Sequence, residues 1–272
     1  MEIIAHRGRI TTAYPESSKE TFEECLKCSY LAGVECDVRI TKDGKVVISH
    51  YDRLFNTSKR LKFKSISKLN YQELINMDLY PDVIETKVER LQYTKSKDVL
   101  NLAFLKKYVK SIGSLTDLET LLNLYCSKKQ VLVDIKVLKE TINLDIQEYE
   151  KKIMDVLDLY PNNEIAIQSF NPYLLKSIKK HNSHHQIGLL IENNIADITP
   201  DYDFISINKK YMTKEVFDKT KLNNQKLMVW TVDTVLQFKQ LEQMLGPDIE
   251  NITLISRYPD IINEAHIKSL NK

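Results

Sequence analysis

The sequence lacks any long apolar run and any strong excess of charge of one sign. No stretch of its 272 residues approaches the roughly 20 apolar residues that a membrane-spanning helix requires, so stable membrane insertion is not expected. The formal net charge is only +2, with 39 basic and 37 acidic residues, which disfavours a dedicated nucleic-acid binder. The composition, with 43% hydrophobic and 28% charged residues, is typical of a globular protein.

Cysteine is also scarce, and its spacing does not indicate a disulfide framework. Cys25 and Cys28 could touch on one face of a helix, but no second CxxC pair or nearby histidine completes a zinc site. Free, partly buried thiols are therefore expected at all four cysteines. The N-terminal residues MEIIAHRGR do not resemble a signal peptide, so a cytoplasmic location is expected, while the oligomeric state is left open.

Two carboxylates stand two residues apart in the segment GVECDVRI, which is rich in Val and Ile. If this segment is a strand, Glu35 and Asp37 point to the same face, where their charges repel unless something neutralises them. The pair therefore indicates half of a site for a hard metal ion; the alternative is an exposed hairpin whose acids face water. The turn signal Asp43-Gly44 and the segment VVIS then return the chain to His50.

Short apolar segments alternate with helical patterns along most of the chain, which predicts an α/β fold, a (β/α)8 TIM barrel. Its length suits one such domain over residues 1–272. Strands are expected over residues 2–5, 33–40, 130–137, 164–169, 186–192, 203–208, 226–232 and 252–256. Helices are expected from an N-cap at Ser18 to a stop at Gly33, and over 115–125, 146–160, 172–181, 214–221 and 235–245.

The alternation breaks after the second strand, from Arg53 to about Ser111, where Lys and Asn are frequent. A structureless loop of this length is unusual in a compact domain. We therefore expect residues 53–111 to form a small, mainly helical insertion within the barrel domain, with Ser67 or Asn70 capping one helix.

In such barrels the chemistry lies at the C-terminal ends of the strands, and the reactive residues of this sequence fall there. Asp134 and Lys136 are again two residues apart and are predicted to face inward, where unpaired charges are costly. The residues at predicted strand ends are His6, Arg7, Glu35, Asp37, Asp134, Lys136, Trp230 and Thr231.

Three carboxylates at one barrel mouth would form an oxygen-rich site suited to Mg²⁺ or Ca²⁺, and the lack of soft ligands disfavours zinc. Arg7 and Lys136 beside that cation would favour a phosphate group, so the predicted substrate is a small phosphate ester. His6 and His50 are the natural acid and base, because imidazole titrates near neutrality. The remaining histidines are expected on the surface: His181, His184, His185 and His266.

With these residues in place, the chain resembles the glycerophosphodiester phosphodiesterases. The matching segments are IIAHRG, PES, GVECDVRITKDGKVVISH, LVDIKV, QSFNP, GLL and VWTV, in family order along essentially the whole chain. The resemblance implies metal-dependent hydrolysis of a glycerophosphodiester, a small-molecule phosphodiester, to glycerol 3-phosphate and an alcohol. The sphingomyelinase D-like phospholipases share the barrel and are the nearest alternative.

The resemblance also implies roles for individual residues. A divalent metal would be held by Glu35, Asp37 and Asp134, with His6 and His50 as general acid and base. Arg7 and Lys136 would contact the phosphate, Trp230 would line the substrate pocket, and Glu16 would support the site from behind. Two alternatives remain: a phospholipase D-like activity on lysophospholipid or sphingolipid head groups, and a barrel that binds a ligand without turnover.

Four positions depart from the family pattern, and they are where head-group specificity or catalytic efficiency is expected to differ. Ser17 replaces the usual Asn, and Tyr51 replaces the usual Asp after the second histidine. Asp134 replaces the usual Glu and is one methylene shorter. Arg257 reverses the charge of a position near the mouth where Asp is common.

Overall fold

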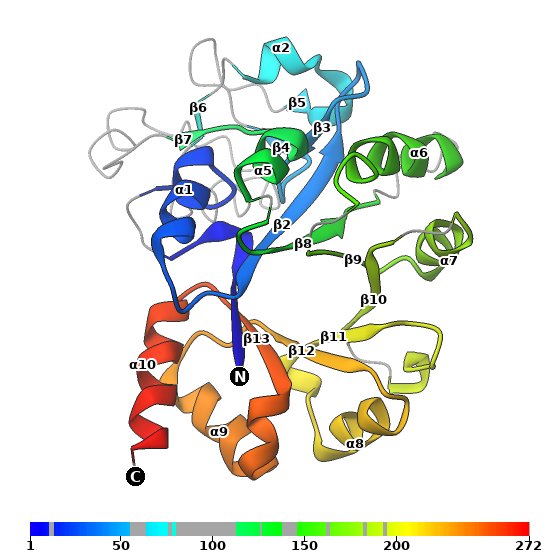
Figure 1. Cartoon of the computed structure of the whole chain (residues 1–272). Helices are drawn as coiled ribbons and strands as arrows, with labels where there is room; N and C mark the ends of the chain where they lie inside the picture. The colour runs from blue at the N-terminus through cyan, green and yellow to red at the C-terminus, as the bar shows by residue number, and fades with distance from the viewer. Residues whose placement is uncertain are drawn as a thin grey trace, which may run out of the picture.

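A closed barrel of eight parallel strands forms the centre of the molecule (Figure 1). The computed structural model describes residues 1–10, 14–54, 64–75, 78–79, 113–125, 127–137, 146–161, 164–181, 184–192 and 195–271. The barrel strands are β1 (Glu2–Ala5), β2 (Gly33–Ile40), β8 (Gln130–Ile135), β9 (Ile165–Ser169), β10 (Gln186–Ile191), β11 (Phe204–Asn208), β12 (Lys226–Trp230) and β13 (Ile252–Ser256). The barrel closes because β1 pairs with both β13 and β2, which confirms the predicted TIM barrel.

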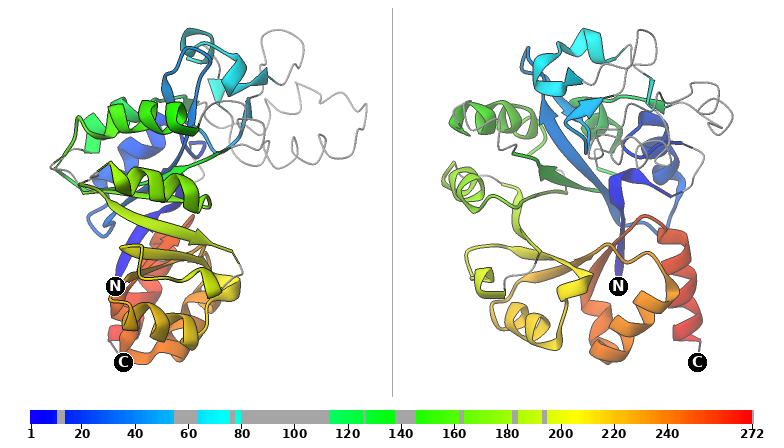
Figure 2. Two further views of the ribbon diagram at one scale, coloured as in Figure 1. Left: turned by 90° about the vertical axis from the view of Figure 1, so that its right-hand side faces the viewer. Right: turned by 180° about the vertical axis from the view of Figure 1, so that it is seen from behind.

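Helices cover the outside of the barrel (Figures 1 and 2). Each buries one stripe of apolar side chains at helical spacing; in the helix after β8, Tyr149, Ile153 and Leu157 lie four residues apart and are buried. The helices are α1 (Lys19–Lys27), α5 (Leu118–Tyr125), α6 (Ile146–Leu157), α7 (Pro172–Lys180), α8 (Lys214–Leu222), α9 (Val235–Leu245) and α10 (Pro259–Leu270).

The predicted start of α1 agrees with the structure, but its predicted end does not. Ser18 is the N-cap of α1, and its side chain accepts a hydrogen bond from the backbone of Thr21 at 3.3 Å. The predicted stop at Gly33 is wrong, because α1 ends at Lys27. The backbone of Ala32 already donates to the carbonyl of Ile3, which aligns the chain with β1 before β2 begins.

The described part of the insertion packs beside the β2–β3 hairpin, where β3 (Val46–Ile48) pairs antiparallel with β2. It contains two short strand pairs, β4 (Arg53–Leu54) with β5 (Lys64–Ser65) and β6 (Asp78–Leu79) with β7 (Gly113–Ser114), and the one-turn helix α2 (Tyr71–Leu74). Asn70, one of the two predicted caps, precedes α2, and its backbone donates to Glu73 at 2.9 Å. The prediction of a mainly helical insertion covers residues 53–111, of which 55–63, 76–77 and 80–111 lie outside the described residues.

Alternate residues of the strands fill the barrel interior, and one glycine makes room for a ring there. Gly188 on β10 pairs in register with Phe204 on β11. A Cβ atom at Gly188 would lie 2.0 Å from the Phe204 ring, so only glycine fits. The apolar cluster of the interior consists of Ile4, Leu132, Ala166, Phe204, Met228 and Ile255.

Replacing Gly188 by alanine is expected to lower the free energy of unfolding by about 1–3 kcal/mol, because the new methyl group overpacks a buried strand. Urea unfolding followed by circular dichroism measures this loss. The double variant Gly188→Ala/Phe204→Leu should recover part of it, since the smaller side chain relieves the clash. Strictly additive losses in the double variant would contradict this explanation.

Two further sequence expectations concern thiols and membrane spans. Cys25, Cys28 and Cys36 are free cysteines, as expected, and Cys126 lies outside the described residues. Among the helices that the structure describes, none has the length and apolar character needed to cross a membrane.

Candidate active site

The candidate site begins at the C-terminal end of β1, where the chain turns sharply. Residues His6–Gly8 form a single 3-10 turn, in which Arg7 has a φ of 53°. This left-handed conformation is rare outside glycine and costs backbone strain, which is often found at functional sites. It directs the backbone N–H of Arg7 to Glu35, whose Oε2 accepts a hydrogen bond at 2.9 Å.

Three carboxylates meet beside this turn. Glu35 and Asp37 come from β2, and Asp134 comes from β8, where it pairs in register with Asp37. All three are at least 96% buried, and one oxygen of each lies within 4.8 Å of the others. The alternative of an exposed hairpin with solvated acids is therefore wrong for Glu35 and Asp37.

Arg7 and Lys136 supply positive charge to these carboxylates. The Nε of Arg7 lies 3.1 Å from Asp37 Oδ2, and its guanidinium also pairs with Glu16. The Nζ of Lys136 lies 2.9 Å from Asp37 Oδ1 and 2.5 Å from Asp134 Oδ2. Asp37 is thus held between both cations, and Glu16 contacts the site through Arg7.

Burial and neighbouring charges give the three carboxylates different pKa values. Burial, followed by repulsion from Asp37 and Asp134, raises the pKa of Glu35 well above its ordinary value. Burial also raises the pKa of Asp134 to about 6, against the attraction of Lys136. Burial acts on Asp37 in the same direction, but Arg7 and Lys136 outweigh it and hold the pKa of Asp37 below its usual range.

The two histidines predicted as acid and base reach the same cavity from different strands. The Nε2 of His6 lies 3.8 Å from Glu35 Oε2. His50 follows β3, and its backbone carbonyl accepts a hydrogen bond from the Arg39 side chain at 2.6 Å. The ring of Tyr51, which replaces the family's usual Asp, packs edge-to-face against the His50 ring, with ring centroids 4.8 Å apart.

Both imidazoles are neutral at pH 7 in the isolated protein. Burial lowers the pKa of His6 well below its ordinary value, and the charge of Arg7 adds to this effect. Burial lowers the pKa of His50 to about 3, although Asp37 opposes the shift. The Nδ1 atoms of both rings are buried without a hydrogen-bond partner in the described parts of the chain. Both rings therefore retain an unused nitrogen.

Ser17 occupies a position whose backbone favours asparagine. It has a φ of 62°, and its N–H donates to the carbonyl of Arg7 at 2.9 Å. Its hydroxyl is buried and has no hydrogen-bond partner among the residues described. Asparagine visits left-handed backbone more readily than serine, which explains why the related family usually has Asn here.

The variant Ser17→Asn is therefore expected to raise the free energy of unfolding by roughly 0.5–1 kcal/mol, by relieving left-handed strain at this position. Thermal denaturation of the two proteins at one pH measures the difference. Ser17→Ala is the control, because it removes the hydroxyl without favouring the left-handed backbone. A loss of stability in Ser17→Asn would show that the amide does not fit the buried site.

Arg257 lies near the mouth, but its charge is paired. Its Nε and Nη2 lie 2.9 and 2.7 Å from Asp233 Oδ2, and its backbone N–H donates to Oδ1 at 2.8 Å. Arg257 does reverse the charge expected at this position, but Asp233, which follows β12, neutralises its positive charge.

The cavity at the mouth has a volume of about 280 Å³ and contains the predicted residues His6, Arg7, Glu35, Asp37, His50, Asp134, Lys136 and Trp230. Five further lining residues were not predicted: Gln168, Phe170, Leu190, Glu192 and Ile255. The strand period of two was a usable signal for some of them. Counting by two from the inward Ala166 gives Gln168 and Phe170.

The carboxylates of this cavity fit a divalent cation. Oδ1 of Asp134 is buried and accepts no hydrogen bond from any described residue, so it has a free lone pair within the cluster. Around this cluster, the carboxylates that meet or pair with Arg7 and Lys136, which are Glu16, Glu35, Asp37 and Asp134, outnumber these two cations by two charges when all are ionised, which is the charge of Mg²⁺ or Ca²⁺.

The four remaining histidines do not line this cavity, but not all of them are surface residues. His181 and His184 are exposed, as predicted. His185 is 5% exposed, and its Nε2 lies 3.3 Å from the carbonyl of Leu157 on α6, so its surface prediction is wrong. His266 is partly buried beside Glu250. Packing between helices, which a polar local sequence does not reveal, explains both differences.

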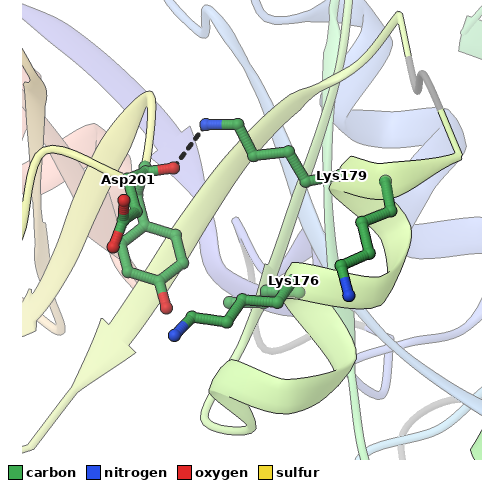
Figure 3. A pocket seen from close by; sticks show the side chains of 6 residues that line it. Lys176, Lys179 and Asp201 are labelled. Atoms are coloured by element: carbon green, nitrogen blue, oxygen red, sulfur yellow. Dashed lines mark hydrogen bonds between the residues drawn. The ribbon is translucent and has the colours of Figure 1, made fainter.

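A second pocket, of about 370 Å³, lies between α7 and the loop that precedes β11. Lys176 and Lys179 line it, and the Lys179 side chain donates to the backbone carbonyl of Asp201 (Figure 3). Asp201 precedes β11, so this pocket lies at the N-terminal ends of the strands, opposite the mouth. It has no histidine in its lining and therefore lacks the acid–base groups of the mouth.

Known proteins are similar to this chain in sequence and in fold. Residues 6–246 match the profile of the Glycerophosphoryl diester phosphodiesterase family. The chain is 25% identical over 256 residues to a glycerophosphodiester phosphodiesterase of Caldanaerobacter subterraneus, with 92% of each chain covered. It is similar to an Oleispira antarctica phosphodiesterase solved in complex with the product sn-glycerol-3-phosphate (TM-score 0.72, 18% identity, 98% of this chain and 97% of that one). A glycerophosphodiester phosphodiesterase of Parabacteroides distasonis gives a TM-score of 0.70 at 15% identity, over 98% of each chain.

Proposed function

Because the chain belongs to the glycerophosphoryl diester phosphodiesterase family, and so is a phosphoric diester hydrolase, we propose that it hydrolyses glycerophosphodiesters to glycerol 3-phosphate and an alcohol. The observation that carries this proposal is the meeting of three carboxylates, two cations and two histidines in one cavity at the barrel mouth. The Oleispira antarctica protein binds its product sn-glycerol-3-phosphate, which supports glycerol 3-phosphate as the product proposed for this chain.

Glu35, Asp37 and Asp134 would hold a divalent cation, Mg²⁺ or Ca²⁺, which when bound polarises a phosphoryl group and offsets its developing negative charge. Arg7 and Lys136 orient the phosphate through its oxygens. Arg7 offers a planar fork of donors fixed in place by Glu16, and Lys136 offers a compact charge at the opposite side of Asp37. Trp230 lines the pocket for the rest of the substrate.

His6 and His50 transfer the protons. One imidazole takes a proton from the attacking oxygen, and the other gives a proton to the oxygen of the leaving alcohol. Their lowered pKa values in the isolated protein keep both rings unprotonated, which is the form that can accept a proton. The bound diester adds a negative charge beside them, which raises the pKa of a neighbouring imidazole and favours the protonated form that the acid requires.

The test is the release of glycerol 3-phosphate and alcohol from water-soluble diesters by the purified protein, with Mg²⁺ or Ca²⁺ and then with EDTA. Release that stops with EDTA and returns with added metal is the expected result. Release from lysophospholipids alone would support the phospholipase D-like alternative. Tight binding of diesters without any release would support a ligand-binding barrel.

Metal affinity is expected to rise with pH. Glu35 and Asp134 have raised pKa values, about 6 for Asp134, so at low pH they hold protons that a metal must displace. The affinity should therefore fall as the pH is lowered from 8 to 5, by about tenfold per pH unit for each carboxyl that is protonated. Calorimetric titration with Ca²⁺ in buffers of different ionisation enthalpy measures both the affinity and the protons released. An affinity independent of pH would contradict the assignment of these ligands.

A further inference from the structure

The cavity at the mouth has a second wall that the proposed reaction does not use. Glu192 follows β10 and Trp230 ends β12, and both line the cavity. Ile191 pairs with Ile207, and Asn208 pairs with Trp230. Continuing this register by one residue places Glu192 and Trp230 at the same height of the barrel, one on each side of β11.

Aromatic rings form the middle of this wall. Phe170 and Trp230 lie edge-to-face, with ring centroids 6.0 Å apart and planes at 83°. The Nζ of Lys136 lies 5.7 Å from the Phe170 centroid, so the aromatic pair begins where the phosphate-binding cations end. The indole Nε1 of Trp230 is buried and donates to no described residue, which leaves it available to an oxygen of a ligand.

Glu192 differs from Asp37 and Asp134, which both pair with cationic side chains. Asp37 pairs with Arg7 and Lys136, and Asp134 pairs with Lys136. Glu192 is exposed at the lip and makes no ion pair within the described ranges. An exposed carboxylate is often only solvated, but this one faces a cavity whose neighbouring wall is aromatic.

We propose that Glu192, Phe170 and Trp230 form a subsite for a positively charged alcohol, an ammonium group such as that of choline or ethanolamine. The proposal rests on the proposed function. Aromatic faces together with a carboxylate attract an ammonium group by cation–π and charge interactions. A diester of such an alcohol is negative at the phosphate and positive at the head group, which matches the cationic and the acidic wall of the cavity.

The test compares three diesters: glycerophosphocholine, its uncharged analogue with a 3,3-dimethylbutyl group, and glycerophosphoglycerol. The wild-type protein is expected to prefer the choline diester over its neutral analogue by about tenfold in kcat/KM, because the two have the same shape and differ in charge. In Glu192→Gln that ratio is expected to fall to the part that the aromatic rings supply, mainly through KM. The matched control is Glu164→Gln, an exposed glutamate before β9 at the other end of the barrel, which should retain the wild-type ratio.

Two results would overturn the subsite. An unchanged ratio in Glu192→Gln means that its carboxylate does not face the head group. An equal loss on all three diesters means that Glu192 supports the fold or the phosphate. If the wild-type protein hydrolyses none of them, the proposed function fails separately, and calorimetric binding of glycerophosphocholine against its neutral analogue then tests the subsite, with equal affinities overturning it.

Discussion

Alanine at His6 or at His50 is expected to lower kcat for glycerophosphodiester hydrolysis by about 100- to 10,000-fold, which is the usual contribution of a positioned acid or base. Both rings line the cavity, both lie beside the carboxylate cluster, and both have a buried Nδ1 that no described residue uses. Steady-state rates with saturating metal measure the loss. Because the two proton transfers belong to one reaction and the rings act as a unit, the double variant should lose little more than the less active single variant.

The control for this experiment is His184→Ala, which removes an exposed imidazole that does not line the cavity. His6 is mostly buried, so His6→Asn, which keeps more of the side-chain volume, should accompany His6→Ala. Thermal denaturation establishes that each variant is folded. Folded variants at both positions with the wild-type rate would show that proton transfer depends on other groups.

The variant Asp37→Asn is expected to lower activity by about 100- to 1,000-fold and also to destabilise the protein. Asp37 is a proposed metal ligand and contacts both Arg7 and Lys136. Removing one partner of a buried ion pair typically costs about 3–5 kcal/mol. Here the loss should lie near the lower end, because Arg7 keeps Glu16 and Lys136 keeps Asp134.

Two measurements separate these effects. Calorimetric titration with Mg²⁺ or Ca²⁺ should show that Asp37→Asn binds metal far more weakly, while chemical denaturation in EDTA measures the loss of the ion pairs alone. The control is Asp43→Asn, an acid in the turn of the same hairpin whose contacts are with Thr41 and Tyr71. A wild-type metal affinity in Asp37→Asn would contradict the proposed ligand set.

The position of the candidate site could be predicted from the sequence because it depends on local rules. The period of two put Glu35 and Asp37 on one face of a strand, and it put Asp134 and Lys136 on one face of another. The barrel then required the ends of both strands to meet. The structure agrees, since Asp37 and Asp134 pair in register and Lys136 bridges them.

The acidic lip of the cavity could not be predicted in the same way. The segment QIGLLIE is apolar at nearly every position, so its pattern does not reveal which alternate residues face the interior. The parity of β10 follows from its register with β9 and β11, in which Gly188 makes room for Phe204. Only that register turns Glu192 toward the cavity.

The sequence by itself determined the parts of this protein that depend on neighbours along the chain: the alternation of strands and helices, the cap at Ser18 and the inward pairs of charged residues. The tertiary structure decided the contacts between distant segments. These include the neutralisation of Arg257 by Asp233, the burial of His185 against α6 and the meeting of Glu192 and Trp230 in the lining of one cavity. The physical reason is that local patterns fix periodicity, whereas the closure and register of the barrel fix which side chains meet.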